Sequence, residues 1–131
     1  MIVVDASAMT ELLLQTAVGA RVEARLLRDD DRLHAPHLLD VEVLQALRRF
    51  VRTGDVDQDR ARQAIEDLML FDILRHAHHD LLGRAFELRG NLSAYDAVYV
   101  ALAEALDARF VTCDRPLGAA PGHRARVEVI R

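Results

Sequence analysis

Five short runs of mostly apolar residues alternate along this chain with longer segments in which apolar positions recur every three or four residues. This alternation predicts short buried strands separated by amphipathic helices. The expected strands cover residues 2–4, 33–36, 73–76, 109–113 and 126–130. Because helices separate them, we expect an α/β fold with a mostly parallel central sheet, folded as one domain over residues 1–131.

Six helices are expected between the strands. Asp5 or Ser7 caps the first helix, and Asp57 starts the fourth. Gly54 closes the third helix, which forms a helical hairpin with the fourth. The expected helices cover residues 6–14, 20–28, 38–52, 57–69, 80–89 and 93–106. The other connections are predicted to be an acidic loop at 29–31, a turn at 115–117 and a small-residue loop at 118–122.

The segment 93–106 has the clearest helical pattern in the chain. Ser93 is a natural N-cap, and Asp96 follows it at the spacing of a capping box, with Asp in place of Glu. One apolar stripe is expected to lie on the core, formed by Val98, Leu102, Ala105 and Leu106. The helix dipole also favours an acid in the first turn, so Asp96 taken alone needs no function.

Three other acids change that interpretation. Asp5 and Asp114 each directly follow a predicted strand, and Glu42 lies early in the helix after Pro36. Ligands of an open parallel sheet bind at the carboxyl ends of its strands, so these acids meet Asp96 there if their strands are neighbours. Four converging carboxylates repel one another unless a cation neutralises them. Ligands made only of oxygen favour Mg²⁺ or Mn²⁺, as one or two ions.

The charge balance is compatible with a polyanionic substrate. The chain carries 21 acidic and 17 basic residues, a formal net charge of −4, and every basic residue is Arg. Setting aside the four clustered acids leaves 17 acids against 17 arginines, so the remainder is neutral overall. A site of this kind suits hydrolysis of phosphodiester bonds by metal-activated water. The absence of Lys excludes P-loop phosphate binding and Schiff-base catalysis by this chain alone.

Four sequence elements resemble the PIN-domain ribonucleases, and among them the VapC toxins of bacterial toxin–antitoxin pairs. The elements are IVVDAS at 2–7, PHLLDVE at 36–42, LSAYDA at 92–97 and FVTCD at 110–114. They occur in the family's order and extend over nearly the whole chain. The resemblance implies a three-layer α/β/α sandwich and metal-dependent endonucleolytic cleavage of RNA.

The resemblance also implies roles for individual residues. It assigns the metal-binding and catalytic acids as Asp5, Glu42, Asp96 and Asp114, and the supporting hydroxyl residues as Ser7 and Thr112. Asp40 is a competing acid, but the family's spacing from the proline favours Glu42. The implied partners are a cognate VapB-type antitoxin and a second copy of the chain, as a homodimer and in hetero-oligomers with the antitoxin. Transfer, ribosomal and messenger RNA all remain open as substrates.

Other features have less specific meanings. Candidates for contact with the RNA backbone are Arg48, Arg49, Arg52 and Arg115. Residues 12–14 are three leucines whose apolar surface suits a partner groove or a dimer face. The histidines at 76, 78 and 79 lie close together, but no Cys or fourth ligand stands at a recognisable zinc spacing.

Two alternatives to the ribonuclease belong to other classes of function. A non-catalytic RNA- or protein-binding module on the same fold is the first, although nothing in the sequence favours it. A phosphatase with Asp5 as nucleophile is weaker, because such sites usually pair the aspartate with a lysine. One Cys, no apolar run long enough to cross a bilayer and no signal-peptide pattern lead us to expect a cytoplasmic protein without membrane contact.

Overall fold

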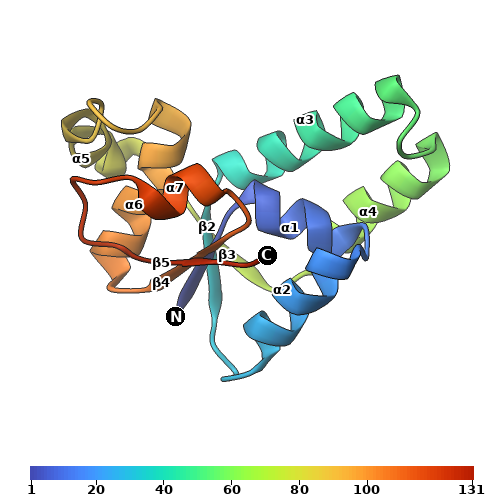
Figure 1. Cartoon of the computed structure of the whole chain (residues 1–131), viewed down its shortest axis with the longest axis horizontal. Coiled ribbons are helices and arrows are strands. Elements are labelled where there is room, and N and C mark those ends of the chain that lie inside the picture. Colours follow the sequence, from blue (N-terminus) through green and yellow to red (C-terminus); the bar gives the residue numbers. More distant parts are fainter.

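The computed structural model describes all 131 residues, and a five-stranded sheet runs through its centre (Figure 1). The strands are β1 (Ile2–Val4), β2 (Leu33–Pro36), β3 (Ile73–His76), β4 (Arg109–Thr112) and β5 (Arg126–Val129). Their order in the sheet is β3-β2-β1-β4-β5, and every neighbouring pair is parallel. The predicted α/β fold is confirmed, and its sheet is parallel throughout.

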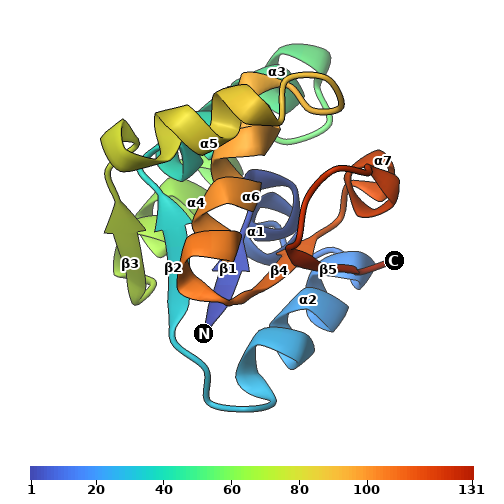
Figure 2. The same cartoon turned by 90° about the vertical axis from the view of Figure 1, so that its left-hand side faces the viewer.

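Seven α-helices and one short 3-10 helix connect the strands. They are α1 (Ala6–Leu13), α2 (Ala17–Leu27), α3 (Leu38–Thr53), α4 (Gln58–Leu70), η1 (His79–Leu81), α5 (Leu82–Glu87), α6 (Ala94–Leu106) and α7 (Arg115–Ala119). Helices α1 to α4 cover one face of the sheet, and α5 and α6 cover the other (Figure 2). The sheet is therefore the middle of three layers. None of the helices is both long and apolar enough to cross a membrane.

Strand β1 lies at the centre of the sheet, between β2 and β4. Its residues Ile2, Val3 and Val4 are fully buried, and their β-branched side chains suit a strand covered on both faces. Val3 is paired with Phe110 and Val4 with Val111, and both partners in β4 are also fully buried. This register makes β1 and β4 end side by side at one edge of the sheet.

Helix α6 lies across the central strands and packs against β1, β2 and β4. Ser93 caps it as predicted, since its Oγ accepts a hydrogen bond from the Asp96 backbone N–H at 3.1 Å. All residues from Ala97 to Ala103 are buried, because α5 packs on the side of α6 that the sheet leaves open. The predicted single stripe is therefore too narrow, and Ala105, predicted to face the core, is exposed.

The second helix begins earlier than predicted. Thr16 is its N-cap, because the Thr16 Oγ1 accepts a hydrogen bond from the Gly19 backbone N–H at 2.9 Å. Gly19 then lies in the first turn, where an added Cβ would stand only 2.0 Å from the carbonyl oxygen of Glu11. Gly19 therefore allows α1 and α2 to pack closely, and it does not mark a helix boundary.

The predicted helix over 80–89 is also wrong in detail. The chain forms η1 and then the short helix α5, which ends at Glu87. Leu82 and Phe86, two of the apolar residues of this segment, are 55% and 66% exposed. The buried residues of this segment are Leu81, Ala85 and Leu88, so only one narrow side of it packs on α6.

Two further expectations are corrected near the ends of strands and helices. The predicted turn at 115–117 is the start of α7, where Pro116 stands in the first turn and Leu117 is buried. Proline suits that position because the first turn has no intrahelical use for its missing N–H. Leu12 and Leu13 are buried in the core at 8% and 2% exposure, so the predicted exposed leucine face is not formed by them.

Candidate functional site

The four acids predicted to form the site lie around the carboxyl edge of the sheet. Asp5 follows β1 and Asp114 follows β4, and these two strands are neighbours. Asp96 lies in the first turn of α6, and Glu42 lies in α3, the helix that follows β2. The charge of Asp96 acts on both Asp5 and Glu42, and the charge of Asp114 acts on Asp96. The structure thus brings all four into one electrostatic cluster.

Asp5 is held by hydrogen bonds to both of its carboxylate oxygens, and it is only 6% exposed. Its Oδ1 accepts from the Ser7 hydroxyl at 2.6 Å and from the Ala8 backbone N–H at 3.0 Å. Its Oδ2 accepts from the Thr112 hydroxyl at 2.5 Å. The bond from Ala8 makes Asp5 the N-cap of α1, which decides between Asp5 and Ser7.

Ser7 and Thr112 join the ends of β1 and β4 around Asp5. Their hydroxyl oxygens are 3.2 Å apart. Besides donating to Asp5, each hydroxyl accepts from the backbone after β4: Ser7 from the Cys113 N–H at 2.9 Å, and Thr112 from the Asp114 N–H at 3.0 Å. The network fixes Asp5 relative to the backbone of Asp114. That the two hydroxyls support catalysis stays a prediction.

Burial and mutual repulsion make these carboxylates harder to ionise. Burial raises the pKa of Asp5 to about 6, and the hydrogen bonds it accepts offset part of that rise. Burial also raises the pKa of Glu42 and of Asp96, and the neighbouring acid adds to each rise. Clustered shifts of this kind are typical of functional sites. A bound cation would relieve both the desolvation and the repulsion.

Tyr99 belongs to this site and was missed in the sequence, where only the apolar stripe of its helix was considered. It is 1% exposed, and its ring stacks on that of Phe110 with 6.0 Å between centroids. Its hydroxyl lies near Glu42 and Asp5 but has no hydrogen-bond partner in acceptable geometry. Burial and the charges of these two acids raise the pKa of Tyr99, so the O–H remains a donor. The available signal was its position one turn after Asp96.

The composition of the cluster fits a hard divalent cation. Its four side chains offer only carboxylate oxygens, which Mg²⁺ and Mn²⁺ prefer. No three His, Cys, Asp or Glu side chains stand close enough together to enclose one ion. Mg²⁺ does not need such a cage, because it keeps several waters and usually binds through one or two carboxylates. The arrangement therefore suits an ion that enters with part of its hydration shell.

Comparison with known proteins decides the family. The PIN domain family matches residues 2–122. Ribonuclease VapC1 of Mycobacterium tuberculosis is 40% identical over 130 residues, which cover 98% of this chain and 97% of that protein. The chain belongs to the VapC ribonucleases of the PIN-domain family.

Solved structures agree with the fold of this VapC-family protein. PAE2754 from Pyrobaculum aerophilum is 31% identical with a TM-score of 0.67, and the match covers 90% of this chain and 77% of that one. VapBC2 from Rickettsia felis, bound to a DNA fragment from their promoter, matches with a TM-score of 0.67 over 100% of both chains. At 16% identity the latter supports the fold alone. The predicted family and its α/β/α sandwich are confirmed.

The arginines predicted to contact RNA lie on two helices of the VapC-family protein. Arg48, Arg49 and Arg52 are exposed on α3, and Arg115 is exposed on α7. None of the four forms an ion pair within the protein. Their guanidinium groups are therefore not paired with any carboxylate of the protein. Their contact with RNA stays a prediction.

Asp40 is engaged elsewhere. Its two carboxylate oxygens accept hydrogen bonds from the Arg75 guanidinium at 2.8 and 2.9 Å, which ties α3 to β3. The acid of α3 whose pKa is raised by the charge of Asp96 is Glu42.

The histidines gather near the ends of β2 and β3. The His76 Nε2 lies 2.9 Å from the His34 Nδ1, and the two rings stack. The His78 Nε2 accepts a hydrogen bond from the Leu38 backbone N–H at 2.9 Å, close to the start of α3. These contacts use all three histidines inside the fold.

Proposed function

We propose that this protein is the toxin of a toxin–antitoxin pair and that it hydrolyses phosphodiester bonds of RNA with Mg²⁺ or Mn²⁺. The observation that carries the proposal is the convergence of four carboxylates on the edge where β1 and β4 end, with raised pKa values for three of them. Membership in the VapC ribonucleases supports RNA as the substrate.

The residues at the site would have different roles in this reaction. Each ion would be held by one or two of the carboxylates of Asp5, Glu42, Asp96 and Asp114, with water completing its shell. When bound, the metal supplies an activated water and stabilises the charge that grows on the phosphate oxygens. The hydroxyls on Asp5 and the Ser93 cap below Asp96 keep the carboxylates in place. Tyr99 stays protonated near Glu42 and Asp5, so its hydroxyl is available as a donor beside these acids.

The proposal is tested by Asp96→Asn, which removes one charge from the cluster and keeps the side-chain shape. We expect the variant to lose metal-dependent cleavage of a single-stranded RNA in Mn²⁺, and to bind Mn²⁺ more weakly in calorimetry. Asp59→Asn is the matched control, because Asp59 also lies in the first turn of a helix but is exposed on α4. The control is expected to cleave as the wild type does.

Two results would contradict the proposal. Cleavage by rigorously purified Asp96→Asn at the wild-type rate would mean that the acids are misassigned. RNA binding by the wild type without any cleavage or Mn²⁺ uptake would favour the non-catalytic binding module instead.

The proposed partners follow from the same family. An antitoxin that restrains the nuclease is supported by the relatives of this chain, which carry the VapC name.

We also propose self-association through exposed apolar residues such as Leu82 and Phe86 on α5, which sedimentation would detect. The proposal places the protein in the cytoplasm, where cellular RNA is available.

A further inference from the structure

A groove opens between α1 and α3 directly beside the acid cluster, with a volume of about 430 Å³. Small-molecule sites typically have volumes of about 300 to 1,000 Å³, so one nucleotide fits. Its main lining residues are Ser7, Thr10 and Glu11 from α1 and Gln45, Arg49 and Phe50 from α3. In both helices these positions recur every three or four residues, so each helix presents one continuous side to the groove.

The groove is continuous with the acid cluster. Ser7, which donates to Asp5, and Glu42, one of the four acids, both line it. From Glu42 to Phe50 the helix α3 advances about 12 Å. An RNA strand with its scissile phosphate at the acids therefore has an adjoining nucleotide within reach of the groove.

Two polar side chains of the groove have no partner inside the protein. Thr10 is only 5% exposed, yet its hydroxyl makes no hydrogen bond. This oxygen is closed to solvent, so the polar contacts open to a ligand come from the residues of α3. Gln45 is exposed on α3, and its amide offers both a donor and an acceptor, as the edge of a base requires. Phe50 adds an aromatic face of the kind on which unpaired bases stack.

Arg49 supplies the positive charge of the groove. Its guanidinium lies 5.5 Å from the centroid of the Phe50 ring and forms no ion pair with the protein's carboxylates. The carboxylate of Glu11, by contrast, already accepts a hydrogen bond from the Thr16 hydroxyl. Arg49 is therefore placed to bind a phosphate beyond the base.

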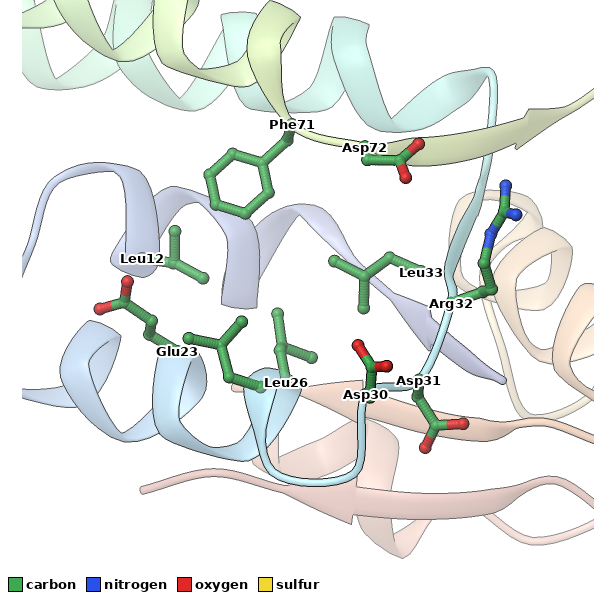
Figure 3. A pocket seen from close by; sticks show the side chains of 10 residues that line it. Leu12, Glu23, Leu26, Asp30, Asp31, Arg32, Leu33, Phe71 and Asp72 are labelled. Atoms are coloured by element: carbon green, nitrogen blue, oxygen red, sulfur yellow. The ribbon is translucent and has the colours of Figure 1, made fainter.

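A second pocket, between α1, α2 and the end of α4, has apolar side chains inside and acids at its rim (Figure 3). Leu12, Leu26 and Phe71 point into it. Its rim carries the acids Glu23, Asp30, Asp31 and Asp72 against the single base Arg32. Four acids against one base repel a polyanion more than the groove between α1 and α3 does, where Glu11 and Glu42 stand against Arg49. The groove also adjoins the acid cluster, so it is the better nucleotide site.

We propose that the groove between α1 and α3 binds the nucleotide adjoining the scissile phosphate of single-stranded RNA, with Gln45 contacting the base and Arg49 the next phosphate. The base must be unpaired to enter between two helices. The inference rests on the proposed ribonuclease function and adds a determinant of which RNA sequence is cut.

The placement is tested by cross-linking, which does not depend on cleavage. A pool of short single-stranded RNAs of random sequence, with 4-thiouridine in place of uridine, is irradiated with the Asp96→Asn variant, and cross-linked peptides are identified by mass spectrometry. We expect cross-links in the α3 segment from Glu42 to Phe50. Their absence from both α1 and α3 overturns the proposal, whether or not the wild-type protein cuts RNA.

The roles of Gln45 and Arg49 are tested by sequencing the sites cut in the same kind of RNA pool. Gln45→Ala is expected to relax the base preference beside the cut. Arg49→Ala is expected to raise KM about tenfold, because it removes one charged hydrogen bond, with kcat changed less than about twofold. Arg62→Ala is the control, since Arg62 is exposed on α4 away from the groove.

The outcomes separate this proposal from the proposed function. If the wild type cuts RNA, an unchanged base preference in Gln45→Ala together with equal effects of Arg49→Ala and Arg62→Ala overturns the groove assignment alone. If the wild type cuts no RNA, the ribonuclease function fails, and the cross-links still decide whether the groove binds a nucleotide.

Discussion

Asp5 combines a structural role with an energetic cost. Its Oδ1 caps α1 through the Ala8 N–H, and its Oδ2 holds the hydroxyl of Thr112 at the end of β4. The same burial raises its pKa to about 6, so ionising Asp5 at neutral pH opposes folding. A residue placed only for capping would not need such burial. Such a cost is expected of the proposed metal ligand, because a bound cation would relieve it.

This cost predicts a pH dependence of stability in the absence of divalent ions. Asp5 has a pKa of about 6 in the folded protein against 3.8 as its ordinary value, so the folded state binds the proton more tightly. Its contribution to stability is largest below about pH 4 and is lost as the pH rises through about 6. A shift of about two pKa units corresponds to about 3 kcal/mol. Thermal unfolding in a chelator across this pH range measures the effect.

The Asp5→Asn variant isolates the contribution of this one carboxyl group. Its stability is expected to change less between pH 4 and 7 than that of the wild type, by about 3 kcal/mol or somewhat under. Glu66→Gln, at an exposed position on α4, is the control and is expected to follow the wild type. Equal pH slopes in Asp5→Asn and the wild type would mean that Asp5 is not buried as a costly charge.

Among the elements, α6 connects the core to the chemistry. Its buried middle fixes the helix against three strands, and its first turn carries Asp96 at the edge of the sheet. The Ser93 hydroxyl accepts from the Asp96 N–H at 3.1 Å, so one hydrogen bond orders the turn that holds the acid. The N-cap of α6 therefore serves both stability and the site.

Ser93→Ala is expected to lower stability and cleavage together. Loss of an N-cap typically costs about 1 kcal/mol. Fraying of the first turn also displaces Asp96, and because a shift of 1 Å can cost about a hundredfold in rate, we expect a loss of roughly tenfold. Urea unfolding and RNA cleavage rates measure the two effects.

Asp57→Ala is the matched control for this prediction. Asp57 caps α4 by accepting from the Arg60 N–H at 2.9 Å, but α4 carries none of the four acids. The control is expected to lose similar stability and to keep its cleavage rate. A similar fall in cleavage for both variants would show that global stability, and not the position of Asp96, sets the rate.

The elements differ in how far their sequence predicts them. The strands were predicted within about one residue because β-branched runs such as Ile2 to Val4 have a pattern of their own. The α5 segment was not, because its exposed Leu82 and Phe86 break the relation between apolar and buried on which the prediction rests. The helix predicted to start at residue 20 starts at Ala17, because the missing Cβ of Gly19 serves contact between helices and does not end one.

The residues of the site also differ in how well the sequence predicts them. Asp5 and Asp114 could be found because they directly follow strands, and a capping residue marked Asp96. For Tyr99 the position one turn after Asp96 was the one signal, and local sequence does not show which hydroxyls lack a partner after folding. That property depends on contacts between helices far apart in the chain.

At the scale of the whole molecule, two different surfaces lie on either side of α1. One is the groove with Gln45 and Arg49 beside the acid cluster. The other is the apolar pocket with an acidic rim between α1, α2 and α4 (Figure 3). A neighbouring pocket continues it along α4 to Leu70. A nuclease restrained by an antitoxin needs one surface for its substrate and one for its partner. The acidic rim favours a partner segment that is apolar with basic residues.

This division predicts where the antitoxin binds. Leu70 is 84% exposed, and Asp67 and Asp72 line the same pocket, so Leu70→Ser is expected to weaken antitoxin binding about tenfold without changing cleavage of free RNA. Leu82→Ser, a matched change on α5 at 55% exposure, is expected to leave antitoxin affinity unchanged. Calorimetry with the purified antitoxin measures both. If Leu82→Ser weakens binding and Leu70→Ser does not, the antitoxin covers the α5 side of the sheet, and the acidic pocket has another purpose.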